Sequence, residues 1–257
     1  MQTRRAGLSS LVLIALVGCD RVATLAEAQP PIQTPVALPV TGDAAIGAPL
    51  RMALSSFGPD VARDVVVLLA AQKEAVILAN DGSGALVEKG RIALGATPVS
   101  VAALDVDDDG DADLAIACKA PNTVKILIND GAGGMTLSGP REIALPGEPV
   151  RLMAQQLDDI AHGPVGDVPL GARIDLLVGV QLALAPTRGA VVIYHNQGDG
   201  KFVAAQTVVA SPGTGGTPIL DDVDSGDIDN DKDIDIIFTA GAGRDSTIRV
   251  LANSGAA

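Results

Sequence analysis

Short apolar runs recur along the chain, and polar turn residues separate them. One such run, "AVILANDG", begins at Ala75 and ends in Asn, with Gly two residues later. An Asn-x-Gly turn favours positive φ and a tight hairpin between two strands. The pattern occurs four times, and the four turn asparagines are Asn80, Asn129, Asn196 and Asn253. The sequence therefore predicts four copies of one hairpin.

The segment before each hairpin follows a second shared pattern. It contains an apolar strand, an acidic or polar loop, and a strand that opens with Asp. These aspartates are Asp64, Asp113, Asp175 and Asp235. One unit is then a four-stranded antiparallel sheet, which cannot bury both of its faces alone. Repeats of this kind predict an all-β fold, a β-propeller-like array of about four four-stranded antiparallel blades.

The composition agrees with many short strands around an aliphatic core. Hydrophobic residues make up 47% of the 257 residues, whereas aromatic residues make up 2%. The 29 glycines and 16 prolines indicate many turns. The net charge of −13 argues against a nucleic-acid partner and against docking onto anionic lipid heads.

Residues 1–18 have the features of a secretory signal peptide. Arg4 and Arg5 precede an apolar run at residues 11–17 that is too short to span a bilayer. Residues 16–19, "LVGC", resemble the lipobox of bacterial lipoproteins. The resemblance implies lipidation of Cys19, export, and anchoring in the bacterial cell envelope, at the periplasmic face or on the cell surface. The alternative is an ordinary signal peptide with an incidental Cys.

Residues 19–49 are rich in Pro and Ala and are predicted to form a tether for a repeat domain at residues 50–257. One piece of the tether, residues 34–40 ("TPVALPV"), is alternatively an edge strand. The fourth unit has no segment for its last strand after Asn253, so this N-terminal strand would complete the last blade and close the array. An open or truncated array is the alternative.

The loop of the second unit, "DVDDDGDAD", has carboxylates at positions 1, 3, 5 and 9 and Gly at position 6. Oxygen ligands at this density select a hard cation such as Ca²⁺. The fourth unit repeats the pattern in "DIDNDKDID". An EF-hand is excluded, because position 12 is Ile116 or Phe238 instead of Glu and the flanks alternate as strands do. An acidic, solvated turn is the alternative to a cation site.

These units resemble the FG-GAP/VCBS repeats found in the β-propellers of integrin α-subunits and in many bacterial secreted proteins. The resemblance runs from about residue 50 to the C-terminus, and it implies Ca²⁺ held in the loop between the first two strands of a blade. The ligands implied in the first loop are the side chains of Asp105, Asp107, Asp109 and Asp113 and the carbonyl of Asp111. Those implied in the second are the side chains of Asp227, Asp229, Asp231 and Asp235 and the carbonyl of Asp233.

The other two units depart from this pattern. The first unit keeps Asp60 and Asp64 but lacks the early carboxylates, so we expect no metal there. In the third unit an insertion separates Asp158 from Asp175, which weakens the case for a metal.

Few residues indicate catalysis. His162 and His195 are interpreted as surface or locally bonded histidines. Cys118 lies in a strand-like run and is interpreted as a small buried hydrophobe, not a disulfide partner. No nucleophile elbow, His-Glu-x-x-His pair or Cys-x-x-Cys pair occurs. Three Phe and one Tyr also supply few aromatic platforms for processing sugars.

The favoured function is a calcium-stabilised lipoprotein that binds a protein or glycan ligand, or acts in adhesion, on the bacterial envelope. Contact with the membrane is expected through the lipid anchor alone. Two alternatives are a propeller-based enzyme, such as a polysaccharide lyase or hydrolase, and a scaffold or truncated relic with no binding role. Residues 159–174, 181–189 and 241–246 form the most variable loops and would carry specificity.

Overall fold

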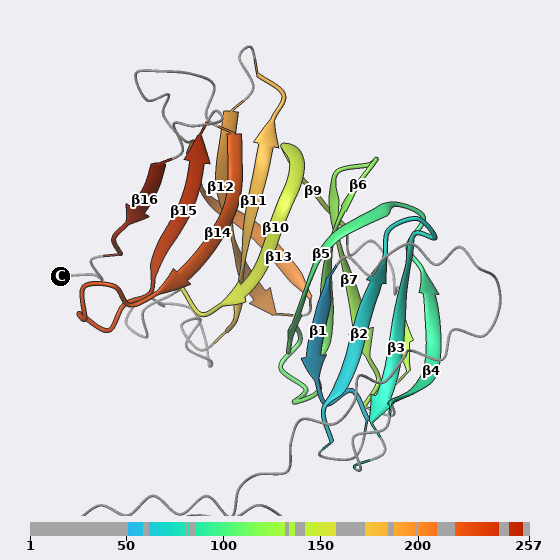
Figure 1. Ribbon diagram of the computed structural model, residues 1–257. Helices are drawn as coiled ribbons and strands as arrows, with labels where there is room; N and C mark the ends of the chain where they lie inside the picture. The colour runs from blue at the N-terminus through green and yellow to red at the C-terminus, as the bar shows by residue number, and fades with distance from the viewer. Residues whose placement is uncertain are drawn as a thin grey trace, which may run out of the picture. The chain divides into compact units, whose positions relative to one another are not determined.

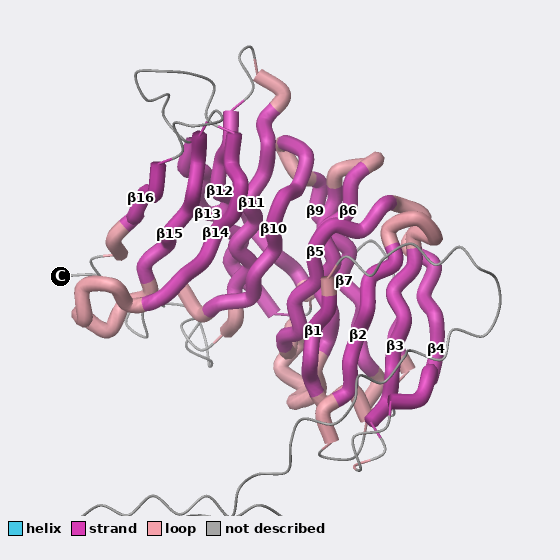
Figure 2. The backbone as a smooth tube through the Cα atoms, in the orientation of Figure 1, coloured by secondary structure: helices cyan, strands magenta, loops and turns pink. Residues whose placement is uncertain are grey.

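A computed structural model gives the fold of this chain. It describes residues 51–58, 62–80, 82, 86–131, 134–136, 142–157, 173–184, 188–198, 200–209, 219–241 and 247–253. Every regular element among these residues is a β-strand, and paired strands run antiparallel (Figure 1, Figure 2). No helix in this described part is long and apolar enough to cross a membrane. The all-β prediction is confirmed.

The strands form four sheets, one for each predicted repeat. The first sheet contains β1 (Met52–Ser55), β2 (Asp64–Leu69), β3 (Glu74–Asn80) and β4 (Leu86–Ala93). The second contains β5 (Thr97–Leu104), β6 (Asp113–Lys119), β7 (Thr123–Asn129), β8 (Met135–Thr136) and β9 (Glu142–Ala144). Both β8 and β9 pair with β7, so the fourth strand of this unit is present in two pieces.

The third sheet contains β10 (Gly147–Gln155), β11 (Asp175–Leu182), β12 (Arg188–Gly198) and β13 (Lys201–Val209). The fourth contains β14 (Ile219–Gly226), β15 (Asp235–Gly241) and β16 (Thr247–Leu251). Among the described residues, the fourth sheet therefore has three strands. The predicted closing strand at residues 34–40 lies outside the described residues, as do the signal peptide, Cys19 and the rest of the tether.

The predicted Asn-x-Gly turns explain how the third and fourth strands of a unit are joined. Gly82, Gly131 and Gly198 have φ angles of 81°, 69° and 82°. Glycine adopts this left-handed conformation without the steric cost that a Cβ atom brings. The corresponding Gly255 of the fourth unit lies outside the described residues.

Successive sheets pack face to face through apolar side chains. Along β6, Leu114 and Ile116 belong to the core shared with the first sheet, whereas Ala115 and Ala117 belong to the core shared with the third sheet. A further apolar core joins the third and fourth sheets. Because an inner sheet is buried on both faces, its central strands are apolar at nearly every position.

The first strands of successive units lie beside one another. Contacts join β1 to β5, β5 to β10, and β10 to β14 (Figure 1). Stacked antiparallel sheets whose first strands are neighbours form the propeller-like array that the sequence predicts. In each unit the first strand leads into the loop between the first two strands, and this loop has the acidic pattern in the second and fourth units.

Candidate metal sites in two acidic loops

One buried aspartate opens the second strand of every unit. These framework aspartates are Asp64, Asp113, Asp175 and Asp235. In each case one carboxylate oxygen accepts the backbone N–H of the turn asparagine, at distances of 2.8–2.9 Å. The framework aspartate therefore ties the start of the second strand to the end of the third.

The other oxygen of the framework aspartate holds the preceding loop. In three units it accepts a backbone N–H seven residues upstream, from Phe57, Val106 or Ile228, at 2.8–3.1 Å. The turn asparagine adds a second link, since Asn129 Nδ2 donates to the carbonyl of Ala112 at 3.1 Å. Loop and hairpin thus share one hydrogen-bonded junction.

The first acidic loop brings three carboxylates together above this junction. Oxygen atoms of Asp105, Asp107 and Asp109 lie within 4.8 Å of one another. The backbone turns sharply at two positions of positive φ, 63° at Asp108 and 92° at Gly110. The N–H of Gly110 donates to Asp105 Oδ2 at 2.9 Å, so the carboxylate at position 1 also holds the turn.

The second acidic loop repeats this geometry. Its positions 4 and 6, Asn230 and Lys232, have φ angles of 65° and 81°. The N–H of Lys232 donates to Asp227 Oδ2 at 3.0 Å, the same bond that Gly110 makes in the first loop. Oxygen atoms of Asp227, Asp229 and Asp235 lie within 4.8 Å of one another. Two distant segments therefore fold into one loop type.

The predicted ligand sets are brought together in part. In the first loop the group of close carboxylates does not include Asp113, whereas in the second loop it includes the counterpart Asp235. Both oxygens of each of these two aspartates accept backbone N–H groups. The second group does not include Asp231, whose Oδ1 accepts the N–H of Asp233. Asp111 and Asp233 were expected to contribute backbone carbonyl oxygens. The distances between side-chain carboxylates do not test that expectation, so it stays a prediction.

The electrostatics of both loops favour a cation. Burial, together with the charges of Asp107 and Asp109, raises the pKa of Asp113 to about 6 although two backbone N–H groups oppose the shift. Burial and the charge of Asp231 likewise raise the pKa of Asp229. Clustered carboxylates that repel one another fit a hard divalent ion, which takes oxygen ligands and offsets their charge.

An arginine from the third unit reaches the first acidic loop, and sequence reasoning missed it. Arg173 Nε donates to Asp108 Oδ2 at 2.8 Å, and the two residues are 65 positions apart in sequence. The Arg173 side chain is largely buried, and its guanidinium also lies against Gly198. No local signal predicts this contact, because it depends on how the second and third units pack.

In the third unit a histidine contacts the framework aspartate. His195 Nδ1 lies 3.2 Å from Asp175 Oδ2, the counterpart of the oxygen that accepts the loop N–H in the other units. The interpretation of His195 as a locally bonded residue agrees with this contact. Asp158, His162 and most of the insertion lie outside the described residues.

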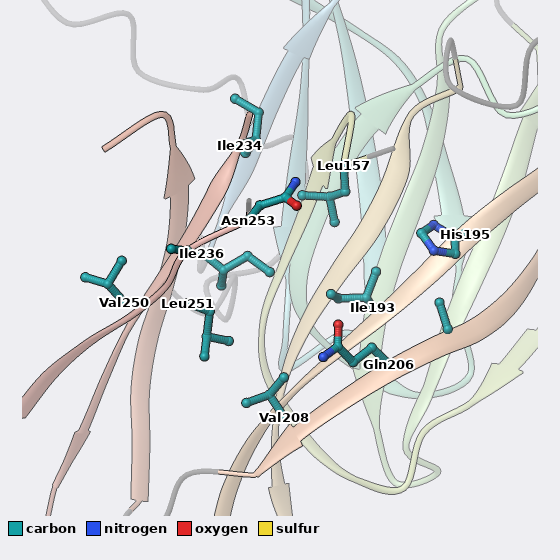
Figure 3. Close-up of a pocket in the computed structure, with 12 residues that line it drawn as sticks. Leu157, Ile193, His195, Gln206, Val208, Ile234, Ile236, Val250, Leu251 and Asn253 are labelled. Atoms are coloured by element: carbon teal, nitrogen blue, oxygen red, sulfur yellow. The ribbon is translucent and has the colours of Figure 1, made fainter. Parts of the chain in front are cut away.

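A cavity of about 650 Å³ lies between the third and fourth sheets (Figure 3). Its apolar wall includes Ile193, Val208 and Leu251, and polar groups are contributed by residues such as His195 and Gln206. The cavity runs beside β16, at the edge where the fourth strand of a complete unit would pair. Its size is within the range of small-molecule sites, and polar and apolar groups share its lining.

Cys118 lies in the core between the first two sheets. Burial raises the pKa of its thiol to about 12, so the thiolate is a negligible species at neutral pH. The interpretation of Cys118 as a small buried hydrophobe agrees with this environment.

Comparison with known families gives one match. Residues 173–238 match the FG-GAP-like repeat family, the repeat that the loops and hairpins resemble. The matched segment extends from the end of the insertion through the third hairpin to the second acidic loop and β15. A search of curated proteins found none that matches the chain.

Proposed function

Because the chain carries an FG-GAP-like repeat and a carboxylate cluster in each of two equivalent loops, we propose that it is a calcium-stabilised binding module on the bacterial envelope, anchored by a lipid at Cys19. The observation that carries this proposal is the turn that the two acidic loops share, with positive φ at positions 4 and 6 in both. An accidental acidic turn would have no reason to repeat this geometry in two units.

Calcium would act on structure. Asp105, Asp107 and Asp109 would hold one ion, and Asp227, Asp229 and Asp235 would hold the other. Each ion would cancel repulsion within its cluster and fix the loop between the first two strands. Fixing the loop would also stabilise the hairpin, because the framework aspartate accepts hydrogen bonds from both the loop and the turn asparagine.

Ligand binding is proposed for the loops that differ between units, on the rigid frame of stacked sheets. The insertion at residues 159–174 is the longest of these loops. Specificity that resides in variable loops on a fixed scaffold would suit a protein or glycan ligand. Deleting residues 160–171 should then abolish capture of the envelope ligand while the calcium-dependent melting temperature is retained.

The test for ligand binding is affinity capture from solubilised native envelopes, with the immobilised chain in calcium or in EDTA. We expect a ligand that is retained in calcium by the wild type and lost by the loop deletion. Equal retention by both proteins would contradict the role of the insertion, and no calcium-dependent retention would contradict a calcium-supported binding role.

The test for the anchor is a Cys19→Ser substitution. We expect the variant to move from the membrane fraction to the soluble or secreted fraction, because the lipid-bearing thiol is removed. Cys118→Ser is the matched control and should leave the protein in the membrane fraction. If wild type and Cys19→Ser fractionate alike, the lipid anchor is excluded.

A further inference from the structure

In the third unit an arginine stands where the acidic loops have an aspartate. Arg173 lies two residues before the framework aspartate Asp175. Its counterparts in the second and fourth units are Asp111 and Asp233. The charge at this position is therefore reversed in the unit that follows the first acidic loop.

Arg173 packs over the turn of its own hairpin. A Cβ atom added to the turn glycine Gly198 would lie 2.9 Å from a guanidinium nitrogen of Arg173. In the second unit the carboxylate of Asp111 occupies the same place, because a Cβ atom added to Gly131 would overlap it. The two side chains start from equivalent positions, and the longer arginine side chain also reaches the neighbouring unit.

The group that Arg173 reaches is Asp108, position 4 of the first acidic loop. Arg173 Nε donates to Asp108 Oδ2 at 2.8 Å, and only 16% of the Arg173 side chain is exposed. Asp108 has a φ angle of 63°, a left-handed conformation that is costly for a residue with a Cβ atom. A charge-assisted hydrogen bond from a largely buried arginine stabilises this conformation.

A second contact joins the same loop to the third unit. The N–H of Gly200 donates to the carbonyl of Val106, position 2 of the loop, at 3.3 Å. The Val106 side chain is fully buried in the core shared with the third sheet. Positions 2 and 4 of the loop therefore contact the third unit, whereas the clustered carboxylates stand at positions 1, 3 and 5.

The second acidic loop adopts the same turn with its even positions exposed. Position 2 is Ile228, which is 46% exposed, and position 4 is Asn230, which is exposed and has a φ angle of 65°. The turn thus forms without an arginine bound to position 4. The contribution of Arg173 is to hold the first loop in this turn and to link it to the third unit.

We propose that Arg173 is a positioning residue for the first acidic loop, and that it couples calcium binding there to the contact between the second and third units. This inference rests on the proposed function, because it requires calcium in the first loop. Repulsion among Asp105, Asp107 and Asp109 opposes the closed loop when calcium is removed, and the bond from Arg173 resists that opening. Coupling is reciprocal, so calcium strengthens the contact between the units by the factor by which Arg173 improves calcium affinity.

Charge alone predicts the opposite sign for Arg173. A guanidinium near the loop repels a cation, so its removal would tighten calcium binding, whereas removal of the Asp108 charge would weaken it. However, Arg173 bonds to position 4, outside the group of clustered carboxylates, and Asp108 offsets its charge. Positioning therefore outweighs repulsion in this proposal, and the two effects are separated by the signs of two substitutions.

The experiment is calorimetric calcium titration of the full chain carrying Cys19→Ser, which removes the lipid, and Asp229→Ala, which removes binding by the second loop. Arg173→Gln and Asp108→Asn should each weaken calcium binding by about tenfold, within the range of about 5- to 150-fold that is typical of coupled sites. The double variant keeps the net charge of its parent. It should remain about tenfold weaker, because both substitutions remove the same contact.

Arg151→Gln is the matched control. Arg151 Nη1 lies 3.7 Å from Asp222 Oδ1, so this arginine also pairs with an aspartate of another unit, but the pair joins two strands and includes no residue of an acidic loop. Its substitution should leave calcium affinity unchanged. Asp108→Asn is compatible with folding, because 44% of the Asp108 side chain is exposed and asparagine tolerates the left-handed conformation.

Hydrogen exchange at Gly200 gives a second readout, in the third unit. Its N–H donates to the first acidic loop, so calcium should slow its exchange by about tenfold when Arg173 is present and have little effect in Arg173→Gln. The N–H of Gly198 is the internal control, because it donates to Asn196 Oδ1 within the third unit at 2.9 Å. A merely structural role of Arg173 would not make exchange at Gly200 depend on calcium.

Calcium binding that is unchanged or tighter in Arg173→Gln would overturn the inference, as would parental affinity in the double variant. Either result leaves the proposed function standing, because calcium is still bound. Absence of calcium uptake by the chain with Arg173 and Asp108 intact would overturn the inference together with the metal site in the first loop.

Discussion

Position 6 of the two acidic loops is where one residue would set the affinity of the proposed metal sites. Both loops adopt positive φ there, 92° at Gly110 and 81° at Lys232. Left-handed backbone costs a residue with a Cβ atom about 1–2 kcal/mol, whereas glycine adopts it freely. Lys232 therefore holds a conformation that its Cβ atom makes costly.

We therefore predict that Lys232→Gly tightens calcium binding at the second loop by about tenfold, since 1.4 kcal/mol corresponds to one decade in affinity. Calorimetric titration in an Asp109→Ala background, which removes binding by the first loop, isolates this site. Wild-type Asp109 with Lys232→Gly is the control for the first loop. Unchanged affinity at the second loop would contradict the strain argument alone.

A second residue-scale prediction concerns pH. The pKa of Asp113 is raised by burial to about 6, above its ordinary value of 3.8. Between these two values the folded chain binds the proton more readily than the unfolded chain, so protonation of Asp113 stabilises the calcium-free fold as pH falls from 7 to 5. The pKa of Asp235 is lowered by N–H groups of Ile228 and Asn253, so its contribution is lost only at more acidic pH.

Melting curves in EDTA at pH 7 and pH 5 measure this effect, and the same curves in saturating calcium provide the comparison. We expect the calcium-free melting temperature to be higher at pH 5, and the gain from calcium to be smaller there because protons compete for the carboxylates. A calcium-free melting temperature that falls between pH 7 and pH 5 would contradict the assigned role of Asp113.

The acidic residues of the loops could be identified from sequence. Which of them cluster and which bond to the hairpin or to the next unit could not. The alternating pattern brought Asp105, Asp107 and Asp109 together as expected. The bonds that turn Asp113 toward Asn129 depend on the hairpin that follows, and the contact of Arg173 depends on the packing of the next unit. Spacing along the chain contains neither piece of information.

At the scale of elements, the framework aspartate and turn asparagine form one module that does not require an acidic cluster. The first unit has this module, with Asp64 accepting N–H groups from Asn80 and Phe57, although its loop lacks the early carboxylates. The module is therefore structural in its own right, and the acidic cluster is an addition to it.

We predict that Asp64→Ala lowers the free energy of unfolding by about 2–4 kcal/mol, because two N–H groups lose their acceptor and one of them is buried. Urea unfolding in EDTA and in calcium measures this loss, which should be the same in both because the loop of the first unit lacks the early carboxylates. Asp221→Ala, which changes an exposed aspartate on β14, is the control and should have little effect. A loss that calcium reverses would mean that Asp64 serves a metal site.

Element prediction succeeded where a strand is buried on both faces or joined by a tight turn. The runs at β3, β7 and β12 end in Asn-x-Gly turns whose glycines adopt the expected positive φ. Outer strands were harder to define, because β13 is exposed at most positions and the fourth strand of the second unit is divided between β8 and β9. An exposed edge strand tolerates many residue types, so the sequence contains only a weak signal for where such a strand begins and ends.

At the scale of the whole molecule, calcium and net charge are coupled. The chain carries a net charge of −13, and acidic clusters lie in two of its four units. Self-repulsion of this charge opposes the compact state. Two divalent ions bound to the folded chain would offset about four of these charges where they are most concentrated.

The last prediction is therefore a large effect of calcium on thermal stability. A ligand at about 100 times its dissociation constant stabilises the folded state by about 2.7 kcal/mol per site. For a domain of this size each kcal/mol raises the melting temperature by about 2–4 °C, so two sites should raise it by about 10–20 °C. Asp109→Ala and Asp229→Ala should each remove about half of the increase, and together nearly all of it.

Magnesium should give a smaller increase, because it demands a tighter octahedral geometry and loses its water reluctantly. Scanning calorimetry of the four proteins in EDTA, calcium and magnesium provides the measurement. Identical melting in EDTA and in millimolar calcium would exclude both metal sites, whereas an increase that survives both substitutions would place the calcium elsewhere in the chain.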